Sequence, residues 1–354
     1  MKQILKKHRS ICEIASFTLR CRNRFLHRKQ ARSFKFPQNL NVELTNRCNL
    51  NCLYCGREYL IPSSRTEGDI SFSLAEKVIQ EFETITCHSQ TQIQVTPVGL
   101  GEPLLYPRFF EVVSLIRHRM GQARIGVTTN GTCLNDGMIK KIVHSELDSI
   151  LVSINLWSKD LYRIIHKVDQ FDRVLMNTTK LVKARKDRKP MIKIQLLDIA
   201  INQESINKFL DYWEPLRKEN MRFHIRRFIP RSKDVLQLYS EEDRNRYEEM
   251  LGMEDVKLKK KRFPCPQLFD TLSVNREGYV FPCCYGLLLP NDTDLCLGNI
   301  EETSIKSLYS PKAKIHDLRK LHLEGKYDEI EGCGNCTQWI HNENIFFSFL
   351  GRWI

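Results

Sequence analysis

An alternation of short apolar runs with longer amphipathic segments, between residues 40 and 228, constrains the fold more than any other feature of the chain. The apolar runs have the length and the β-branched content of buried strands. They lie at residues 40–44, 93–98, 125–129, 149–154, 192–199 and 223–228. Strands that alternate with helices form right-handed βαβ units and a parallel sheet. Six units are too few for a closed eight-stranded barrel, so they form either a partial barrel or an open sheet. Of these two, we predict an α/β fold with a partial (β/α)6 TIM-like barrel.

Amphipathic helices are predicted between these strands from apolar residues three and four positions apart. They begin near Ser73, Pro107, Met138, Phe171 and Ile206. Glu76 follows Ser73 by three residues, which is the pattern of a capping box at a helix start. In a parallel α/β fold the functional residues lie at the carboxyl ends of the strands. A site is therefore expected in the loops that directly follow the six strands.

The positive charge of the chain is concentrated at its N-terminus. The 354 residues have a formal net charge of +13, and residues 1–35 carry eleven Lys and Arg against one acid, Glu13. The nearly neutral remainder argues against a nucleic-acid partner. The basic arm is compatible with contact to an anionic membrane surface or an acidic partner, or with a mitochondrial presequence. Packing of the arm on the open edge of the barrel is the simpler interpretation. No apolar run approaches about 18 residues, so no transmembrane helix is expected.

Eight of the thirteen cysteines fall into two groups, separated by a stretch from 134 to 264 that contains none. The first group is Cys48, Cys52 and Cys55, directly after the first predicted strand. The second group comprises Cys265, the pair Cys283 and Cys284, Cys333 and Cys336. In a long chain without an apolar signal-peptide core, clustered cysteines indicate metal binding in a reducing compartment rather than disulfides. We therefore expect a cytoplasmic protein.

The two groups differ in the metal chemistry that they predict. Three thiolates on one loop leave a coordination position open, which suits a [4Fe–4S] cluster with one open iron. A structural zinc site takes four ligands, so it suits the first group poorly. The tail group ends in Cys-x-x-Cys and, if the adjacent pair supplies one ligand, offers four thiolates, so it fits either an iron–sulfur cluster or zinc. The poorly periodic tail also contains one predicted hairpin, with strands at 272–274 and 279–281.

The first cysteine group carries a resemblance to a known family. The stretch Glu43-Leu-Thr-Asn-Arg-Cys48-Asn-Leu-Asn-Cys52-Leu-Tyr-Cys55 resembles the cluster loop of radical S-adenosylmethionine enzymes, with an aromatic residue before the last cysteine. Three later segments agree, each at the end of a predicted strand. Gly99-Leu-Gly-Glu-Pro103 resembles the segment that receives the methionine amine, Thr128–Thr132 resembles the ribose-side segment, and Val152–Asn155 resembles the next contact strand.

This resemblance, which covers roughly residues 38–230, implies a site and a chemistry. Cys48, Cys52 and Cys55 would hold a [4Fe–4S] cluster whose open iron binds S-adenosylmethionine. The cofactor contacts would come from Tyr54, Gly101, Glu102, Pro103, Thr129, Asn130, Ser153 and Asn155. One electron, supplied by a reductant such as flavodoxin or ferredoxin, would cleave S-adenosylmethionine to a 5′-deoxyadenosyl radical that removes a hydrogen atom from substrate.

The tail resembles the auxiliary-cluster domain called SPASM and its shortened form, twitch. The resemblance implies that Cys265, Cys283, Cys333 and Cys336 hold one auxiliary [4Fe–4S] cluster, with Cys283 chosen over Cys284 because of the family pattern. No cysteine follows Cys336, which favours the one-cluster form. The predicted organisation is a basic N-terminal arm at 1–37, a partial barrel at 38–235, a linker at 236–262 and a SPASM/twitch-like domain at 263–354.

The one-cluster tail of this chain resembles that of dehydrogenases that oxidise an alcohol of a cyclitol or aminosugar. In those enzymes the auxiliary cluster is the electron acceptor. We therefore predict a radical S-adenosylmethionine oxidoreductase acting on a small molecule. Two alternatives stay open: a maturase or epimerase of a ribosomally synthesised peptide, and a non-catalytic iron–sulfur or zinc protein. In an epimerase a cysteine returns a hydrogen atom to the substrate radical, and Cys133 and Cys296 are the candidates for that role. The sequence leaves the substrate and the oligomeric state undetermined.

Overall fold

The structure is a computed structural model, and it describes residues 36–52, 55, 57, 65–89, 91–185, 189–198, 203–227, 241, 262, 264–334 and 336. The basic arm at 1–35, Tyr54 and nearly all of the predicted linker at 236–262 lie outside the described residues. Among the helices that are described, none is long and apolar enough to cross a membrane.

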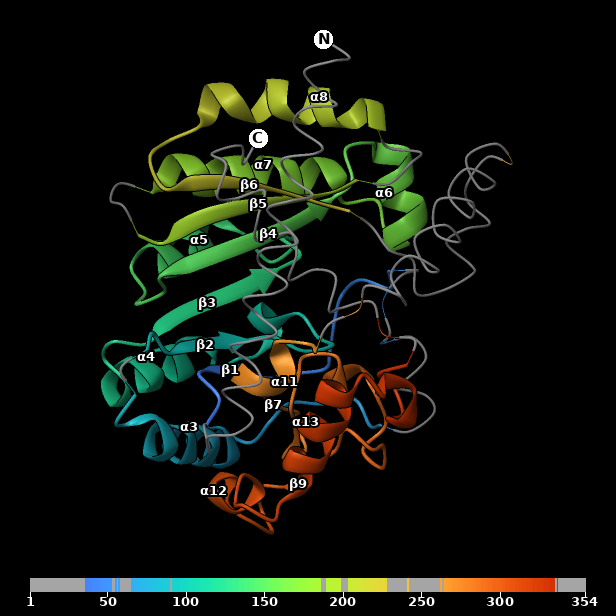
Figure 1. Ribbon diagram of the computed structural model, residues 1–354. Helices are drawn as coiled ribbons and strands as arrows, with labels where there is room; N and C mark the ends of the chain where they lie inside the picture. The colour runs from blue at the N-terminus through green and yellow to red at the C-terminus, as the bar shows by residue number, and fades with distance from the viewer. Residues whose placement is uncertain are drawn as a thin grey trace.

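Six parallel strands form the main sheet, as the sequence predicts. They are β1 (Asn39–Val42), β2 (Gln94–Pro97), β3 (Arg124–Thr129), β4 (Ser149–Asn155), β5 (Met191–Asp198) and β6 (Met221–Arg227). Neighbours in the sheet are also neighbours in sequence, in the order β6-β5-β4-β3-β2-β1, and every pair is parallel. Figure 1 shows that the strand arrows point toward one edge of the sheet, where the loops after β1, β2, β3 and β4 begin.

Helices cover the outer side of the curved sheet (Figure 1). The elements are α3 (Phe72–Thr86), η1 (Pro103–Leu105), α4 (Phe109–Arg119), α5 (Asp136–Val143), α6 (Lys159–His166), α7 (Phe171–Ala184), α8 (Gln203–Trp213) and η3 (Glu214–Leu216). Their apolar faces pack on alternating strand residues such as Val95, Ile125 and Ile150, all of which are fully buried.

Two details of the helices differ from the sequence prediction. Helix α3 starts after Ser71, not at Ser73, because Ser71 has extended backbone and its hydroxyl accepts the N–H of Leu74 at 3.1 Å. The predicted capping box with Glu76 is therefore wrong. Helix α6 has no counterpart among the predicted helices. It is only eight residues long, and Ser158 caps it by accepting the N–H of Leu161.

The tail continues the sheet rather than packing on it from outside. Its elements are α11 (Gln267–Asp270), β7 (Thr271–Val274), β8 (Tyr279–Phe281), η4 (Gly286–Leu288), β9 (Gly298–Asn299), α12 (Ile305–Leu308), α13 (Lys314–Glu324) and η5 (Tyr327–Glu329). The predicted hairpin is confirmed, because β7 and β8 pair antiparallel. Strand β7 also pairs in parallel with β1, with Asn39 opposite Thr271, which extends the sheet to nine strands.

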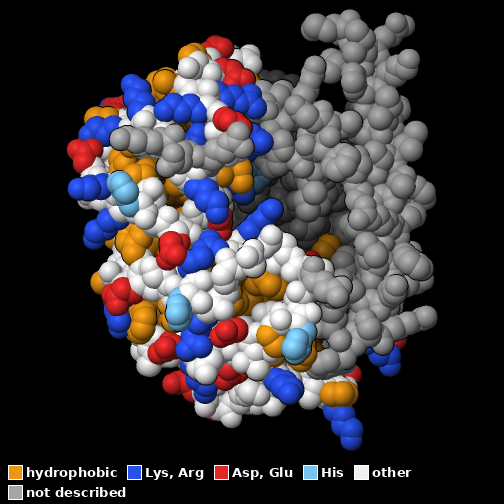
Figure 2. Space-filling view, turned by 90° about the vertical axis from the view of Figure 1, so that its left-hand side faces the viewer, with side chains coloured by type: hydrophobic (Ala, Val, Ile, Leu, Met, Phe, Trp, Pro, Cys, Tyr) orange, Lys and Arg blue, Asp and Glu red, His pale blue; other side chains and the backbone are white. Residues whose placement is uncertain are grey.

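One face of the described part, the left-hand side of Figure 1, carries charges of both signs. Figure 2 shows Lys and Arg side chains interspersed with Asp and Glu over this face, rather than gathered into one basic surface. The expectation that the chain has no nucleic-acid partner concerns the whole surface, and it stays a prediction.

Candidate metal centres

The first cysteine group lies on the loop that follows β1, at the carboxyl edge of the sheet. Polar contacts with residues 66–68 fix the start of this loop: Asn46 donates to the carbonyl of Thr66 and accepts from the N–H of Gly68, each at 2.7 Å. Further along, the N–H of Cys55 bonds to the carbonyl of Cys52 at 2.9 Å. The loop therefore presents its cysteines from a backbone that is held on both sides of Cys48.

The segment Gly99-Leu-Gly-Glu packs directly against this loop, and both glycines are required by the contact. A Cβ on Gly99 would lie 2.7 Å from a carboxylate oxygen of Glu43. A Cβ on Gly101 would overlap the carbonyl oxygen of Thr45 and lie 2.6 Å from that of Arg47. The N–H of Glu102 also donates to the carbonyl of Arg47 at 2.8 Å. The close approach of these two backbones leaves no room for a side chain at Gly101.

Glu102 is buried beside the loop and is already hydrogen-bonded within the chain. One carboxylate oxygen accepts the Thr129 hydroxyl at 2.7 Å and the Leu104 N–H at 3.2 Å, and the other accepts the Asn130 N–H at 2.7 Å. Burial raises the pKa of Glu102 to about 7, although these donors oppose the shift. The carboxylate thus ties together segments that were predicted to contact the cofactor, and Pro103 begins η1 next to it.

The segment after β3 contacts the first cysteine itself. The side-chain amide of Asn130 lies 3.7 Å from the sulfur of Cys48 and donates to the side-chain oxygen of Asn49 at 3.0 Å. Asn49 in turn donates to the hydroxyl of Thr132 at 2.6 Å. Cys133 belongs to the same cluster of contacts, with its sulfur 4.0 Å from the Asn49 amide.

Ser153 and Asn155 lie at the carboxyl end of β4, beside that of β3. The register pairs Val152 with Thr129. The side-chain amide of Gln195, on β5, donates to the Asn155 oxygen at 2.8 Å and lies 3.4 Å from the Ser153 hydroxyl. Asn155 is buried and has a φ of 65°. The structure therefore brings the predicted contact residues that it describes to one edge, while Tyr54 lies outside the described residues.

Sequence reasoning missed two residues of this site, both on α6. His166 is 1% exposed, and its Nδ1 lies 3.4 Å from the sulfur of Cys52. Its carbonyl accepts the N–H of Asn51 at 3.4 Å. The ring of Tyr162 packs on that of His166 with centroids 4.3 Å apart. The signal that could have revealed α6 is Ser158 followed by apolar residues at helical spacing.

The electrostatics of the first site fit a soft, positively charged group. Burial raises the pKa of the Cys48 thiol to about 11, with the neighbouring Glu102 and Cys55 adding to the shift. A thiol in these surroundings becomes a thiolate when a metal binds it, because the metal supplies the missing positive charge. Three cysteines on one loop therefore fit an iron–sulfur cluster with one iron left for another ligand.

The four predicted tail ligands share one cavity. Cys265, Cys283, Cys333 and Cys336 all line it, together with His322 and Tyr285. Burial raises the pKa of Cys265, of Cys283 and of Cys333, to about 12 for Cys333, and other thiols of the group add to the shift in every case. Adjacent buried thiols with mutually raised pKa values fit a metal-cluster site. Within the described residues, no three His, Cys, Asp or Glu side chains are arranged to hold a single metal ion.

Two further cysteines of the tail are distinguished by their contacts. Cys284 follows Cys283, but its N–H is bonded to the side chain of Gln267 at 3.1 Å, and its side chain is not among those lining the cavity. Cys296 lies just before β9, where its sulfur contacts the carbonyl of Gly298 at 3.9 Å. Of the two candidate hydrogen donors, Cys133 contacts the first cysteine loop and Cys296 contacts other residues of the tail.

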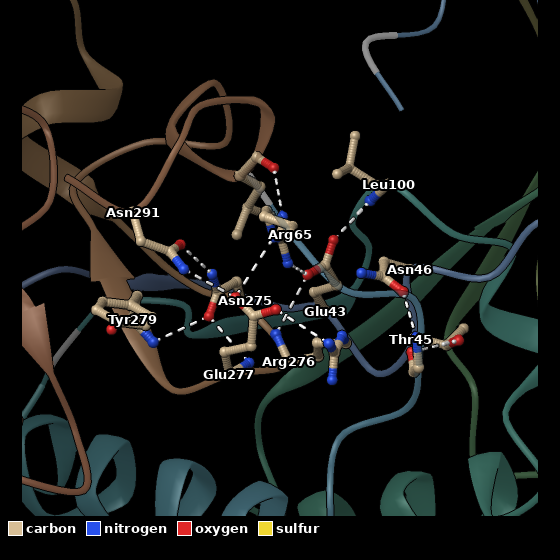
Figure 3. A network of polar contacts seen from close by, with 12 residues as sticks. Glu43, Thr45, Asn46, Arg65, Leu100, Asn275, Arg276, Glu277, Tyr279 and Asn291 are labelled. Carbon is tan, nitrogen blue, oxygen red and sulfur yellow. Dashed lines mark hydrogen bonds and ion pairs between the residues drawn. The ribbon is translucent and has the colours of Figure 1, made fainter. Parts of the chain in front are cut away.

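A buried polar network joins the loop after β1 to the tail (Figure 3). Glu43 and Arg65 form an ion pair whose side chains are both fully buried. Glu43 also accepts the N–H groups of Leu100 at 2.9 Å and Arg276 at 3.2 Å, and Arg65 donates to the carbonyl of Leu287 at 3.0 Å. Glu43 thus contacts the Gly99–Glu102 segment and the β7–β8 hairpin at the same time.

Comparison with known proteins agrees with this geometry. The family model of the Radical SAM superfamily matches residues 42–212, and that of the SPASM iron–sulfur cluster-binding domain matches residues 265–337. This chain is a radical S-adenosylmethionine protein with a C-terminal SPASM domain. Radical S-adenosylmethionine domains use a [4Fe–4S] cluster and S-adenosylmethionine, and SPASM domains bind auxiliary iron–sulfur clusters, so these are the cofactors of the protein.

Curated relatives of this radical S-adenosylmethionine protein have different names and activities. It is 29% identical over 181 residues to the tungsten-containing aldehyde ferredoxin oxidoreductase cofactor-modifying protein of Pyrococcus furiosus, over 49% of this chain and 47% of that protein. It is 32% identical over 146 residues to a probable GTP 3′,8-cyclase of Methanothermobacter thermautotrophicus, over 41% of this chain and 44% of that one. The chain thus spans less than half the length of these relatives.

Solved structures share the fold over most of the chain. BtrN in complex with AdoMet and 2-DOIA aligns with a TM-score of 0.54 at 16% identity, over 86% of this chain and 94% of BtrN. Streptococcus suis SuiB bound to its precursor peptide SuiA aligns with a TM-score of 0.58 at 13% identity, over 84% of this chain and 70% of SuiB. At such identities the likeness concerns the fold alone.

Proposed function

We propose that the chain oxidises a small molecule, at an alcohol carbon of a cyclitol, an aminosugar or a related compound. In this proposal Cys48, Cys52 and Cys55 hold the S-adenosylmethionine-binding cluster, and the tail cysteines that line the common cavity hold one auxiliary cluster. The cofactors, when bound at the first site, supply the electron that cleaves S-adenosylmethionine and the 5′-deoxyadenosyl radical that takes a hydrogen atom from the substrate.

The residues of the chain have distinct tasks in this reaction. S-adenosylmethionine would bind at the carboxyl edge of the sheet, next to the Cys48 loop. The residues at this edge are the Gly99–Glu102 segment, Thr129, Asn130, Ser153 and Asn155. Glu102 fixes this edge by accepting from both Thr129 and Asn130. The buried residues around the loop keep water away from a reactive radical. A one-electron donor protein, such as a flavodoxin or ferredoxin, would supply the first electron.

One observation carries the choice of oxidation over redox-neutral chemistry. The four tail cysteines line one cavity. Four protein thiolates occupy every external position of a [4Fe–4S] cluster, so such a centre transfers electrons and does not bind substrate. A substrate radical that gives one electron to this centre and one proton to solvent becomes a ketone. The substrate has then lost two electrons in all, one of them with the abstracted hydrogen atom. The small-molecule complex of BtrN, which shares the fold, supports this substrate class.

A specific observation favours epimerisation of a peptide as the second candidate. The sulfur of Cys133 lies 4.0 Å from Asn49, the residue next to Cys48. A thiol at this edge could return a hydrogen atom to a substrate radical. SuiB, which shares the fold, is known in a complex with a peptide. The two candidates differ in whether the product is oxidised.

The test begins with anaerobic reconstitution and a count of iron, sulfide and zinc, followed by reduction in the presence of S-adenosylmethionine. We expect about eight iron atoms per chain and formation of 5′-deoxyadenosine. A panel of cyclitols and aminosugars is then assayed for a ketone formed in equal amount to 5′-deoxyadenosine. About four iron atoms and one zinc would contradict the proposed oxidation, because the tail would then hold no electron acceptor.

Cys133→Ala separates the two candidates. If the chain is an oxidoreductase, this variant forms the same amount of ketone as the wild type. If the chain is an epimerase, the wild type incorporates deuterium from heavy water into an unoxidised product, and Cys133→Ala does not. Cys87→Ala serves as the matched control, because Cys87 is an exposed cysteine at the end of α3 and belongs to neither group.

A further inference from the structure

The cavity of the four tail cysteines has a buried histidine in its wall. His322 lies in the last turn of α13 and is 1% exposed. It lines the cavity together with Cys265, Cys283, Cys333 and Cys336. Burying an imidazole has a cost unless its ring nitrogens find partners. The contacts of the two nitrogens therefore indicate what the ring does there.

The first contact fixes the position of the ring proton. The backbone N–H of Cys265 points at Nδ1 of His322, with a distance of 3.3 Å. A backbone N–H can only donate, so Nδ1 accepts and carries no proton. An imidazole with one unprotonated nitrogen is neutral, and its single proton is then on Nε2.

The second contact gives the direction of that proton. Nε2 lies 3.5 Å from the sulfur of Cys333. Since Nε2 carries the proton, it is the donor, and the sulfur of Cys333 is the acceptor. The ring forms a T-shaped contact with that of Tyr327, with centroids 5.0 Å apart, and Arg262 in turn stacks over the Tyr327 ring at 4.1 Å. His322 thus bridges the amide of one cysteine and the sulfur of another.

We propose that His322 is a positioning residue that donates an N–H···S hydrogen bond to Cys333 and thereby raises the reduction potential of the auxiliary cluster. This inference deepens the proposed function and rests on the ligand set given there. A hydrogen bond to a ligating sulfur withdraws negative charge from it, which favours the reduced, more negative state of a cluster. The effect makes the centre a better acceptor for the electron of a substrate radical.

The test measures the potential of the tail cluster alone. In the full-length chain with Cys48→Ala, Cys52→Ala and Cys55→Ala, the remaining cluster is reconstituted and titrated by EPR. Adding His322→Phe should lower the midpoint potential while iron stays at about four per chain. When His322→Gln is added in place of His322→Phe, the side-chain amide can still donate a hydrogen bond. The midpoint potential should then fall by less than it does in His322→Phe. His316→Phe is the matched control on the same helix, at a side chain that is not among those lining the cavity, and it should leave the potential unchanged.

Spectroscopy distinguishes a hydrogen bond from a metal bond. With ¹⁵N-labelled histidine, the reduced cluster should show only a weak nitrogen coupling that disappears in His322→Phe. A strong coupling would mean that His322 is an iron ligand, and it would overturn the proposal. An unchanged potential in His322→Phe, with iron retained, would also overturn it and would leave the proposed function intact. Loss of iron from both His322 variants would overturn it too, by assigning the residue to ligation or folding. Zinc in the parent variant would overturn this inference and the proposed oxidation together.

Discussion

The buried ion pair between Arg65 and Glu43 leads to a sharp prediction about stability. Replacing Arg65 with Met removes the counter-charge of Glu43 and also the hydrogen bond to the carbonyl of Leu287. Glu43 keeps its two backbone donors, from Leu100 and Arg276. Breaking one side of a buried pair costs about 3–5 kcal/mol, because an uncompensated charge stays behind. We expect Arg65→Met to lower the free energy of unfolding of the apo chain by about that amount.

A double-mutant cycle tests this reasoning more strictly than the single variant does. Glu43→Gln replaces the buried carboxylate by a neutral amide. When it is combined with Arg65→Met, no charge of this pair stays buried without a counter-charge. The double variant should therefore be more stable than the sum of the single losses predicts, by about 0.5–3 kcal/mol. The free energies come from reversible urea unfolding followed by circular dichroism and fluorescence, whose transitions must coincide.

The control for this cycle is an exposed arginine. Arg163 forms an ion pair with Asp160 at 3.9 Å, and the side chains are 62% and 86% exposed. Arg163→Met should therefore cost less than about 1 kcal/mol. The reasoning fails if Arg65→Met costs no more than Arg163→Met, or if the losses in the cycle simply add.

Three further predictions concern the site after β1. Gly101→Ala should displace the backbone just before Cys48, so the variant should lose the iron of the first site while the tail keeps about four iron atoms. Gly121→Ala is the control, because a Cβ there would have its nearest neighbour at 3.9 Å, and it should keep both clusters. Equal iron in the two variants would contradict this. Burial raises the pKa of Glu102 from 4.5 to about 7 in the folded chain. The contribution of this group to stability is thus fully present below about pH 4.5 and is lost, by about 3 kcal/mol in all, as the pH rises to about 7. Unfolding of the apo wild type should show this decline relative to Glu102→Gln, and a difference that does not change with pH would count against it. Finally, the chain with Cys48→Ala, Cys52→Ala and Cys55→Ala should retain about four iron atoms but form no 5′-deoxyadenosine; loss of all iron would mean that the two sites do not assemble independently.

Periodicity and cysteine spacing are enough to predict the six parallel strands and the two cysteine groups. Buried strands leave a strong local signal, because runs of apolar residues can be recognised without knowing what they pack against. Glu102, Thr129 and Asn130, which the sequence places after different strands, are hydrogen-bonded neighbours in the structure. Their role as cofactor contacts stays a prediction, as does the choice of cysteine ligands.

The residues that sequence reasoning missed depend on contacts between distant segments. His166 belongs to a helix of only eight residues, too short for a clear periodic signal, and its partner Cys52 is 114 residues away. His322 is oriented by the N–H of Cys265, a backbone group that no side-chain pattern can reveal. Ser71 takes the place of Ser73 as helix cap because the cap depends on backbone conformation at the helix start, which spacing leaves open by one or two residues.

Because β7 pairs with β1, the tail belongs to the same sheet as the strand that leads to the first cysteine group. Composition predicts a boundary near residue 262, yet the sheet crosses it, because Leu40 of β1 lies between Val95 of β2 and Leu272 of β7. Strand β1 is therefore an interior strand, and without the tail one of its edges would lose its hydrogen-bond partners. Glu43, at the end of the same strand, would also lose the N–H of Arg276. Since Cys48 follows on the loop that β1 and Glu43 anchor, the tail supports the first site mechanically in addition to any electron that it accepts.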